Sequence, residues 1–414
     1  MNFSEIKYYL RNTPGISKIY NKFVSNVKGD KFRCDSIPKI VPDIMDNYDN
    51  LRVNLIVPSF ESDFVYGGLT TAIKIFKEVY VKLNADARII VLKGQYSSKS
   101  THRVEGFDYN GDNKNILFLD DSKKVPVCKN DIFICTFWTT MYAITPIFKQ
   151  QIDYFKLNDR KIVYLIQDFE PGFYPWSTEY ALADSTYKNN SNNIVAMFNA
   201  ESLYRYFKNG GYSFGEEIFF DPQMNENLRR NIPRESNRRL KKILIYGRPR
   251  VSRNSFELIR SSLALWSDNY EKANEWEIIS LGAKFDDIRL SRNVISSKGK
   301  VTLDEYAKYM SEAYVGISLM ISPHPSYPPL EMSTFGVKTI TNKFDSKDLN
   351  DFNSNIYNVD FCTPDEIEKQ LEKICDQYYS DPYGMSYRDN DYVKGGSFEK
   401  AIDNLISSIK NMEV

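Results

Sequence analysis

The stretch KKILIYGRPRVSRNSFEL, residues 241–258, decides the fold of the second half of this 414-residue chain. A short apolar run ends in Gly247-Arg248-Pro249, and Arg253 precedes an expected helix. A strand, a glycine turn and a helix in this order gather backbone N–H groups and the positive end of the helix dipole, which stabilise an anion. Arg248 and Arg253 would add permanent charge whose forked geometry matches phosphate oxygens. We predict a diphosphate site, and the alternative is two ordinary surface arginines at a helix start.

Short apolar runs alternate with amphipathic segments on both sides of this stretch, which is typical of parallel strands joined by crossover helices. In the second half we expect strands at 242–246, 276–281, 294–296, 316–320 and 337–341, and helices at 255–266, 303–313 and 329–335. In the first half we expect strands at 51–57, 88–92, 116–119, 132–136, 162–167 and 194–198, and a helix at 69–83. The sequence therefore predicts an α/β protein with two tandem Rossmann-like, doubly wound domains.

The expected domain boundaries follow from this alternation. The run 229–242 holds seven basic residues and one acidic residue around Pro233, and we interpret it as a solvated interdomain linker. The predicted division is a helical extension at 1–50, a Rossmann-like domain at 51–235, a second Rossmann-like domain at 236–385 that holds the predicted diphosphate site, and a helical segment at 386–414 that packs back toward the first domain.

A second motif, SPHPSYPPLEM at residues 322–332, lies between two expected strands. We expect its prolines to open a short helix whose free N–H groups point at the same crevice between strand ends. Glu331 stands between Leu330 and Met332 in a segment that reads as buried, and a buried carboxylate needs hydrogen-bond donors such as the ribose hydroxyls of a nucleotide. The alternative is a solvated or capping glutamate. The donor-binding residues expected here are Tyr327, Pro328, Leu330 and Glu331.

Three weaker candidates belong to other loops. Gly67 and Gly68 open the helix after the first strand and would let backbone approach a substrate, or they form an ordinary tight turn. Asp168 ends a buried strand and would act on the acceptor hydroxyl, as would Glu170, although a carboxylate there is more often a helix cap.

The stretch around Lys300 and Val301 precedes another expected helix. Its backbone is a candidate for ligand contact. The alternative is that the neighbouring Thr302 is simply a helix N-cap, with Asp304 and Glu305 in the first turn.

Composition excludes several classes of function. Basic and acidic residues balance at 54 each, so no global field attracts nucleic acid. Five scattered cysteines without a CxxC pair predict a reduced, cytosolic compartment, and two histidines leave little material for a metal site or a Ser-His-Asp relay. The pair Asp120-Asp121 superficially matches an Asp-x-Asp metal motif, but such pairs are common by chance. We predict no bound metal and no resident cofactor.

Membrane association is the remaining question of location. The sequence lacks the roughly 20 uninterrupted apolar residues of a membrane span. Residues 1–33 hold seven basic and two acidic side chains around an apolar stripe at helical spacing. A helix on a membrane surface is one interpretation, and a helix docked on its own domain is the alternative. We expect a cytoplasmic protein, with peripheral contact at the inner membrane surface as an open possibility.

The two motifs together resemble the family 4 type of retaining GT-B glycosyltransferases. In that family, the glycine-arginine loop and a following basic residue hold the donor diphosphate, while a Glu-x(7)-Glu pair contacts sugar and ribose. The second glutamate corresponds to Glu331, but the first falls at Pro323, so the usual contact to the sugar ring is missing. This departure, with QDFEPGFYPW at 167–176 and HPSYPPLEM, is similar to the WsaF rhamnosyltransferase branch.

The resemblance implies transfer of L-rhamnose from dTDP-β-L-rhamnose to a bacterial surface glycan, O-antigen, capsule or S-layer, on a lipid-linked acceptor. It implies a GT-B fold in which an acceptor-side domain at 51–235 and a nucleotide-sugar-binding domain at 236–385 face a central cleft. Arg248 and Arg253 would stabilise the departing diphosphate, and the backbone around Lys300 and Val301 would line the nucleobase. The alternatives are a UDP- or GDP-sugar donor and a non-catalytic scaffold subunit, which Pro323 keeps open; a sugar-nucleotide 2-epimerase would need more ionisable groups.

Overall fold

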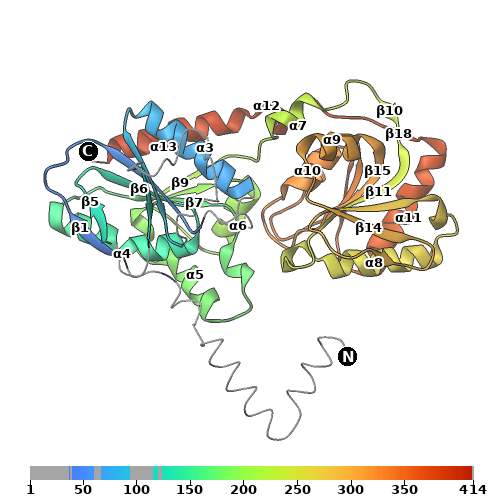
Figure 1. The fold of residues 1–414 in the computed structure, drawn as a ribbon, viewed down its shortest axis with the longest axis horizontal. Helices are drawn as coiled ribbons and strands as arrows, with labels where there is room; N and C mark the ends of the chain where they lie inside the picture. The colour runs from blue at the N-terminus through green and yellow to red at the C-terminus, as the bar shows by residue number, and fades with distance from the viewer. Residues whose placement is uncertain (1–36, 38–39, 60–66, 94–114, 120–123, 413–414) are drawn as a thin grey trace, which may run out of the picture.

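The computed structural model describes residues 37, 40–59, 67–93, 115–119 and 124–412. Two α/β domains lie side by side, and chain segments around the short helices α7 (Glu226–Arg230) and α12 (Asp391–Lys394) pass between them (Figure 1). The predicted helix within residues 1–33 and the pair Asp120-Asp121 lie outside the described residues.

The N-terminal domain is built on a seven-stranded, fully parallel sheet. Its spatial order is β4 (Ile116–Phe118), β3 (Asp86–Val91), β2 (Arg52–Val57), β6 (Asp131–Cys135), β7 (Ile162–Ile166), β8 (Ile194–Phe198) and β9 (Glu216–Phe219). Both faces are covered, which explains why the central strands read as continuous apolar runs. One face packs against α3 (Gly67–Lys82) and α13 (Gly396–Asn411), and the other against α4 (Trp138–Phe155), α5 (Thr178–Lys188) and α6 (Glu201–Asn209).

The C-terminal domain repeats this plan. Its sheet runs β13 (Ile288–Arg289), β14 (Val294–Gly299), β12 (Glu277–Gly282), β11 (Leu240–Gly247), β15 (Ala313–Ile317), β16 (Lys338–Asn342) and β17 (Ile356–Val359), with β13 antiparallel. Helices α8 (Phe256–Asn269) and α11 (Pro364–Ser380) share one core, and α9 (Leu303–Glu312) and α10 (Tyr327–Thr334) share the other. Two doubly wound domains are confirmed. Their strand order reverses between β2 and β6 and between β11 and β15, where such sheets bind ligands at their carboxyl ends.

Several elements escaped the sequence analysis. Strands β9 and β17 each form one edge strand of their sheet. Residues 41–44, within the predicted helical extension, instead form strand β1 (Val41–Ile44), which pairs in parallel with β5 (Lys124–Val127). These strands are short and bury few residues, so they lack the long apolar runs of the central strands.

The interpretation of residues 229–242 as a solvated linker is wrong. The stretch holds the end of α7, strand β10 (Asn237–Arg238), which pairs with β18 (Tyr383–Gly384), and the start of β11. Arg239 is fully buried, and its guanidinium donates to the carbonyls of Met310, Ser311 and Phe335. A basic residue was mistaken for a solvated one because its partners are backbone carbonyls far along the chain.

The end of the chain returns to the N-terminal domain. Helix α13 packs on α3 and β9, and Figure 1 shows it beside α3. Phe398, Ala401, Ile402 and Leu405 recur at helical spacing and join the core of that domain. The two domains are thus tied by a crossing segment as well as by the chain between them.

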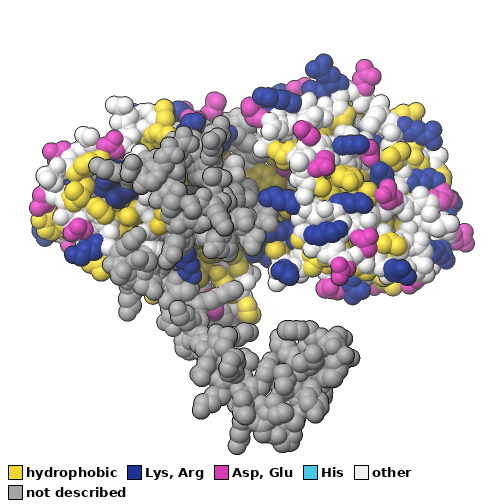
Figure 2. All heavy atoms as spheres, in the orientation of Figure 1, with side chains coloured by type: hydrophobic (Ala, Val, Ile, Leu, Met, Phe, Trp, Pro, Cys, Tyr) yellow, Lys and Arg dark blue, Asp and Glu magenta, His cyan; other side chains and the backbone are white. Residues whose placement is uncertain are grey.

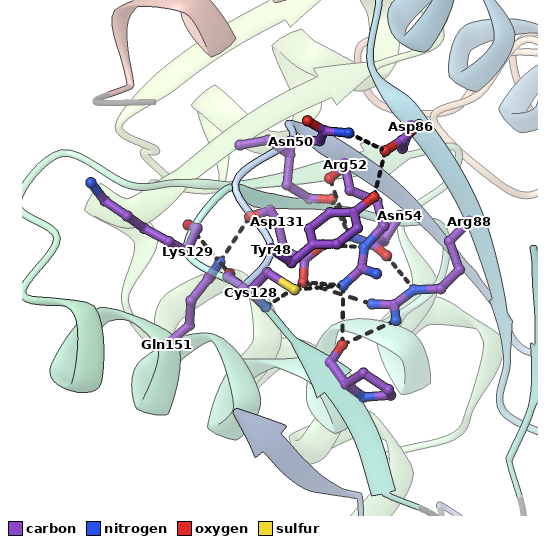
Figure 3. A network of polar contacts seen from close by, with 12 residues as sticks. Tyr48, Asn50, Arg52, Asn54, Asp86, Arg88, Cys128, Lys129, Asp131 and Gln151 are labelled. Atoms are coloured by element: carbon purple, nitrogen blue, oxygen red, sulfur yellow. Dashed lines mark hydrogen bonds and ion pairs between the residues drawn. The ribbon is translucent and has the colours of Figure 1, made fainter. Parts of the chain in front are cut away.

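A buried polar network lies at the amino ends of β2, β3 and β6 (Figure 3). Asp131 is fully buried and accepts hydrogen bonds from Arg52 at 2.7 and 2.8 Å, Asn54 at 2.9 Å and the backbone N–H of Cys128 at 2.8 Å. Arg88 donates to Asn54 and to the Pro126 carbonyl of β5. The network therefore fastens the β1–β5 ribbon to the sheet.

Candidate functional site

The carboxyl ends of β7, β11 and β15 bring three side chains together at the interdomain junction. The Arg253 Nε lies 3.3 Å from the Asp168 Oδ2, and the Ser322 hydroxyl donates to the Asp168 Oδ1. Asp168 also accepts the backbone N–H of Phe169 at 2.8 Å. Asp168 belongs to the N-terminal domain, whereas Arg253 and Ser322 belong to the C-terminal domain, so this carboxylate links the two.

An aromatic ring supports the same arginine. The Arg253 guanidinium carbon lies 3.6 Å from the centroid of Phe173, within range of a cation–π interaction. The turn η3 (Glu170–Phe173) holds that ring. Burial lowers the pKa of Arg253, with Asp168 opposing the shift, but an arginine stays charged at any physiological pH. A desolvated cation is therefore fixed where the two domains meet.

Gly247 and Arg248 lie next to this cation, as the sequence motif requires. A Cβ on Gly247 would stand 2.3 Å from the Ser280 hydroxyl, so only glycine fits there. The charge of Arg248 contributes to lowering the pKa of Arg253, which places the two guanidinium groups within electrostatic reach. Lys and Arg side chains are scattered over the visible face of this domain among neutral, apolar and acidic groups, and some lie at its edge beside the N-terminal domain (Figure 2).

Two helices start near this point without a side-chain cap. Helix α8 follows Ser255 at φ 47°, and α10 follows Ser326 at φ 68°, and neither serine side chain bonds the first turn. By contrast, the N-caps of α9 and α11, Thr302 and Thr363, each accept a backbone N–H. Left-handed backbone at non-glycine residues is costly and gathers at functional sites. Helix α8 thus keeps first-turn N–H groups for an anion.

The expectation of several free N–H groups at the start of α10 is wrong. Pro328 and Pro329 occupy its first turn and have no N–H, and the N–H of Ser326 donates to the His324 Nδ1 at 3.0 Å. The N–H of Tyr327 is what remains there. Helix α10 therefore contributes mainly side chains.

Glu331 on α10 faces a group of tyrosines. It is partly exposed as a residue, but surrounding protein crowds its carboxyl group and raises its pKa to about 7, an effect that the Tyr306 hydroxyl partly offsets. Its charge in turn helps to raise the pKa values of Tyr306, Tyr327 and Tyr392. The Tyr306 hydroxyl is close enough to donate to Glu331, and the buried Tyr392 hydroxyl has no hydrogen-bond partner among the described residues. The Glu331 carboxylate, an acceptor, and tyrosine hydroxyls, which can donate, therefore lie together on this side of α10. Leu330 and Met332 are buried beside Glu331, as the sequence indicated.

Gly67, Gly68 and Pro323 lie near contacts between the two domains. Gly67 and Gly68 begin α3, and a Cβ on Gly68 would lie 3.1 Å from the Gln167 Oε1. The hydroxyl of Tyr327 interacts with Thr71 on that helix, so α3 and α10 meet across the junction. The Pro323 carbonyl accepts the Ser202 hydroxyl at 2.8 Å, also across the junction.

Lys300 is exposed, and Val301 packs partly against the core of α9 and α10. Thr302 is indeed the N-cap of α9, in a capping box with Glu305. That the backbone of this stretch lines a nucleobase stays a prediction.

A role for Glu170 at the acceptor is wrong. It is 2% exposed and accepts the backbone N–H of Trp138 at 2.6 Å, at the start of α4, and the Tyr164 hydroxyl at 3.1 Å. Burial raises its pKa to about 8. Glu170 therefore caps a helix from inside the domain.

The sequence analysis missed three side chains near Asp168. Ser322 and His324 lie in the second motif but received no role, and Lys347 lies in no motif. Burial lowers the pKa of His324 to about 4 and that of Lys347 to about 7. The Lys347 ammonium donates to the Met320 carbonyl at 2.6 Å and so braces the loop that carries Ser322. Only the structure reveals Lys347, because its partner is a backbone atom.

Among the described residues, no three or more His, Cys, Asp or Glu side chains are grouped so that they could hold a metal ion. In the same part of the chain, no helix has the length and apolarity to cross a membrane.

Comparisons with known proteins agree with this arrangement. Residues 52–201 match the family described as WsaF, N-terminal domain, and residues 241–372 match WsaF, C-terminal domain. O-antigen biosynthesis protein RfbC of Myxococcus xanthus is 30% identical over 226 residues, which are 54% of this chain and 16% of that protein. The chain thus spans a small part of that relative.

Solved structures share the fold. The pneumococcal O-GlcNAc transferase GtfA, in complex with UDP and GlcNAc, has a TM-score of 0.57 at 9% identity over 88% of this chain and 99% of that one. Sucrose-phosphate synthase from Thermosynechococcus elongatus has 0.53 at 10% identity, over 87% and 94%. Anabaena HepE, in complex with UDP and glucose, has 0.52 at 9% identity, over 87% and 95%. With both domain matches spanning most of its length, the chain belongs to the WsaF family and has the GT-B fold.

Proposed function

We propose that this enzyme transfers L-rhamnose from dTDP-β-L-rhamnose to a hydroxyl of a bacterial surface glycan, with retention at the anomeric carbon. The observation that carries the proposal is the desolvated Arg253 at the junction, held by Asp168 and Phe173 beside Arg248 and the uncapped α8. A nucleoside diphosphate is the ligand that such a cation pair fits. The rhamnose donor rests on membership of the WsaF family, and the glycan acceptor on the likeness to an O-antigen biosynthesis protein.

In this proposal the C-terminal domain holds the donor. Gly247 lets backbone approach the diphosphate, and Arg248 and Arg253 neutralise it, so the reaction uses protein cations and no metal. Glu331 accepts a hydrogen bond from the nucleoside sugar. Thymidine diphosphate carries a deoxyribose, so its 3′-hydroxyl is the one available donor for that contact. Tyr327, Pro328, Leu330, Lys300 and Val301 line the nucleoside, and Gly67 and Gly68 approach from the other domain.

The chemical step exchanges one bond at the anomeric carbon. The bond from that carbon to the β-phosphate oxygen breaks, the acceptor oxygen bonds the same face, and the acceptor proton passes to the departing phosphate oxygen. The products are dTDP and a rhamnoside of the donor's configuration. Arg248 and Arg253 stabilise the negative charge that develops on the leaving group, which is usually the largest catalytic contribution in such a site.

Asp168 serves in this proposal as a positioning residue. Its carboxylate already accepts the Ser322 hydroxyl and the Phe169 N–H and pairs with Arg253, so little of it is left to receive a proton from the acceptor. What it does is fix the guanidinium in the geometry that transfer requires.

One observation favours a different candidate. Pro323 stands where related enzymes carry the first glutamate, and its carbonyl is occupied by Ser202. A scaffold that binds nucleotide or glycan without turnover would fit that feature, as would a UDP- or GDP-sugar donor. The retained cation pair favours catalysis, because burying charge without a ligand is costly. We further propose that the acceptor glycan is linked to a lipid and that transfer takes place at the cytoplasmic face of the membrane.

The test is a transfer assay with purified enzyme. It would be given dTDP-β-L-rhamnose, UDP-glucose or GDP-mannose with a rhamnose-terminated oligosaccharide, and the product's anomeric proton would be read by NMR. We expect a β-rhamnoside from the dTDP donor, formed at the same rate without added metal ions. An α-linked product contradicts retention, transfer from another donor contradicts rhamnose, and nucleotide binding without any transfer supports the scaffold.

A further inference from the structure

Trp176 is unusual in being almost completely exposed. Its exposed fraction is 96%, whereas those of Trp138, Trp266 and Trp276 are 2%, 0% and 3%. Its ring stacks on Tyr180 at the start of α5, with centroids 6.4 Å apart and planes at 26°. Single exposed apolar side chains are common, but two stacked rings present a larger continuous apolar surface to a ligand.

Hydrogen bonds order the backbone on both sides of the pair. The side chain of Ser177, which lies between Trp176 and Tyr180 in the sequence, accepts the Tyr180 backbone N–H and caps α5. Before Trp176, the turn η3 orders the chain up to Phe173. A backbone ordered in this way loses less conformational entropy when a ligand binds the rings.

The pair is continuous with the interdomain junction. Trp176 lies three positions after Phe173, whose ring supports Arg253, so their Cα atoms lie within about 11 Å. Tyr180 also lies within electrostatic reach of Tyr206, and the Tyr206 ring is 6.3 Å from that of Phe344 in the other domain. Aromatic rings therefore lead from the exposed indole to the junction.

Local charge indicates which ligand fits. No Lys or Arg occurs between Lys161 and Lys188, while Asp168, Glu170, Glu179 and Asp184 do. An anionic membrane surface attracts basic segments, so this one is poorly suited to it. A neutral sugar ring offers an apolar C–H face to an aromatic ring and hydroxyls to water and nearby polar groups, and Trp and Tyr combine apolar area with a polar group in the same way.

We propose that Trp176 and Tyr180 form a subsite for the acceptor glycan, on which a sugar ring of the growing chain stacks while its terminal hydroxyl reaches the junction. The subsite rests on the proposed transferase function and adds to it the place where the acceptor is gripped. It predicts that longer acceptors are better substrates than a single sugar.

The first test separates acceptor binding from donor binding. Trp176→Ala is expected to raise the acceptor KM about thirtyfold, the lower limit for an interface hot spot, and to leave dTDP affinity and donor hydrolysis without acceptor unchanged. Trp176→Phe should restore part of the acceptor affinity. Phe361→Ala, which removes a 72% exposed aromatic ring from the C-terminal domain, is the matched control. An unchanged acceptor KM in Trp176→Ala would overturn the subsite.

The second test uses the indole as its own probe. All four tryptophans of the sequence lie in the described part of the chain, and Trp176 is the exposed one, so acrylamide quenching of the native protein reports on it. A synthetic L-rhamnose trisaccharide should reduce the quenching, and phosphatidylglycerol vesicles should not. Shielding by vesicles alone, or by neither, contradicts the subsite. Shielding by a glucose trisaccharide instead keeps the subsite and contradicts the rhamnose acceptor. If the native protein does not bind dTDP, the proposed function itself is contradicted.

Discussion

The N-terminal domain carries one charged cluster at each end of its sheet, and the two differ in how deeply the carboxylate is buried and in whether the cluster includes the other domain. At the amino ends, Asp131 is fully buried and accepts four hydrogen bonds. At the carboxyl ends, Asp168 keeps a 13% exposed side chain and shares Arg253, itself 26% exposed, with the other domain. A network closed on itself stabilises a fold, whereas a cluster with donors to spare can accept a ligand. The comparison assigns stability to the first and chemistry to the second.

The largest effect is expected at the closed network. Asp131→Ala leaves two buried guanidinium groups, Arg52 and Arg88, without their carboxylate, and breaking such a pair costs about 3–5 kcal/mol of unfolding free energy. Urea denaturation measures the loss. Nucleotide affinity per folded molecule should not change. The comparison fails if stability is kept and nucleotide binding is lost.

The next largest effect is expected at the cluster of Asp168 and Arg253, where a substitution should reduce activity and leave stability unchanged. Arg253→Ala should lower kcat/KM by about 10²–10³-fold, the effect of removing one donor from a site of developing charge. Steady-state rates measure it, and the melting temperature should stay close to that of the wild type. Arg260→Ala on α8 removes an exposed arginine paired with Glu257 and is the control. Equal rates for both variants would remove Arg253 from the site.

Glu331→Gln should weaken dTDP binding and stabilise the free protein. The Gln side chain keeps an acceptor oxygen but loses the charge that strengthens the hydrogen bond, a difference of about 1.4 kcal/mol, or about tenfold in affinity. The folded-state pKa of about 7 is above the usual 4.5, so the wild type loses stability as pH rises through that window, and the amide does not. Melting temperatures should therefore favour the variant at pH 8 and converge near pH 4.

The exposed Glu257→Gln is the control for Glu331→Gln, since its side chain is 77% exposed. A variant at position 331 that binds dTDP as tightly as the wild type would show that the carboxylate does not contact the nucleotide.

The smallest effect is expected for Ser322→Ala. It removes one of the contacts that orient Asp168, and a single hydrogen bond contributes about 1 kcal/mol, so kcat should fall several-fold while dTDP affinity holds. The shape of the pH–rate profile should be unchanged. A profile that shifts would indicate that Asp168 transfers a proton, against the positioning role.

The sequence predicted the fold well because the central strands are buried on both faces and read as apolar runs, as for residues 162–167 and 194–198. Arg248, Arg253 and Glu331 were found because they lie in local motifs beside a turn or a helix. Phe173, Ser322 and Lys347 received no role, since their partners are distant residues or backbone atoms. Arg239 misled for the same reason: charge is visible in a sequence, and its burial is not.

The most direct test of the central claim, that the junction around Arg253 holds the diphosphate of a dTDP-sugar, is calorimetric titration with dTDP, UDP and GDP, with and without magnesium, of the wild type and of Arg253→Ala. The account predicts selective dTDP binding that is independent of magnesium and is lost in the variant. Preference for UDP or GDP would contradict the donor, and equal binding by wild type and variant would contradict the site.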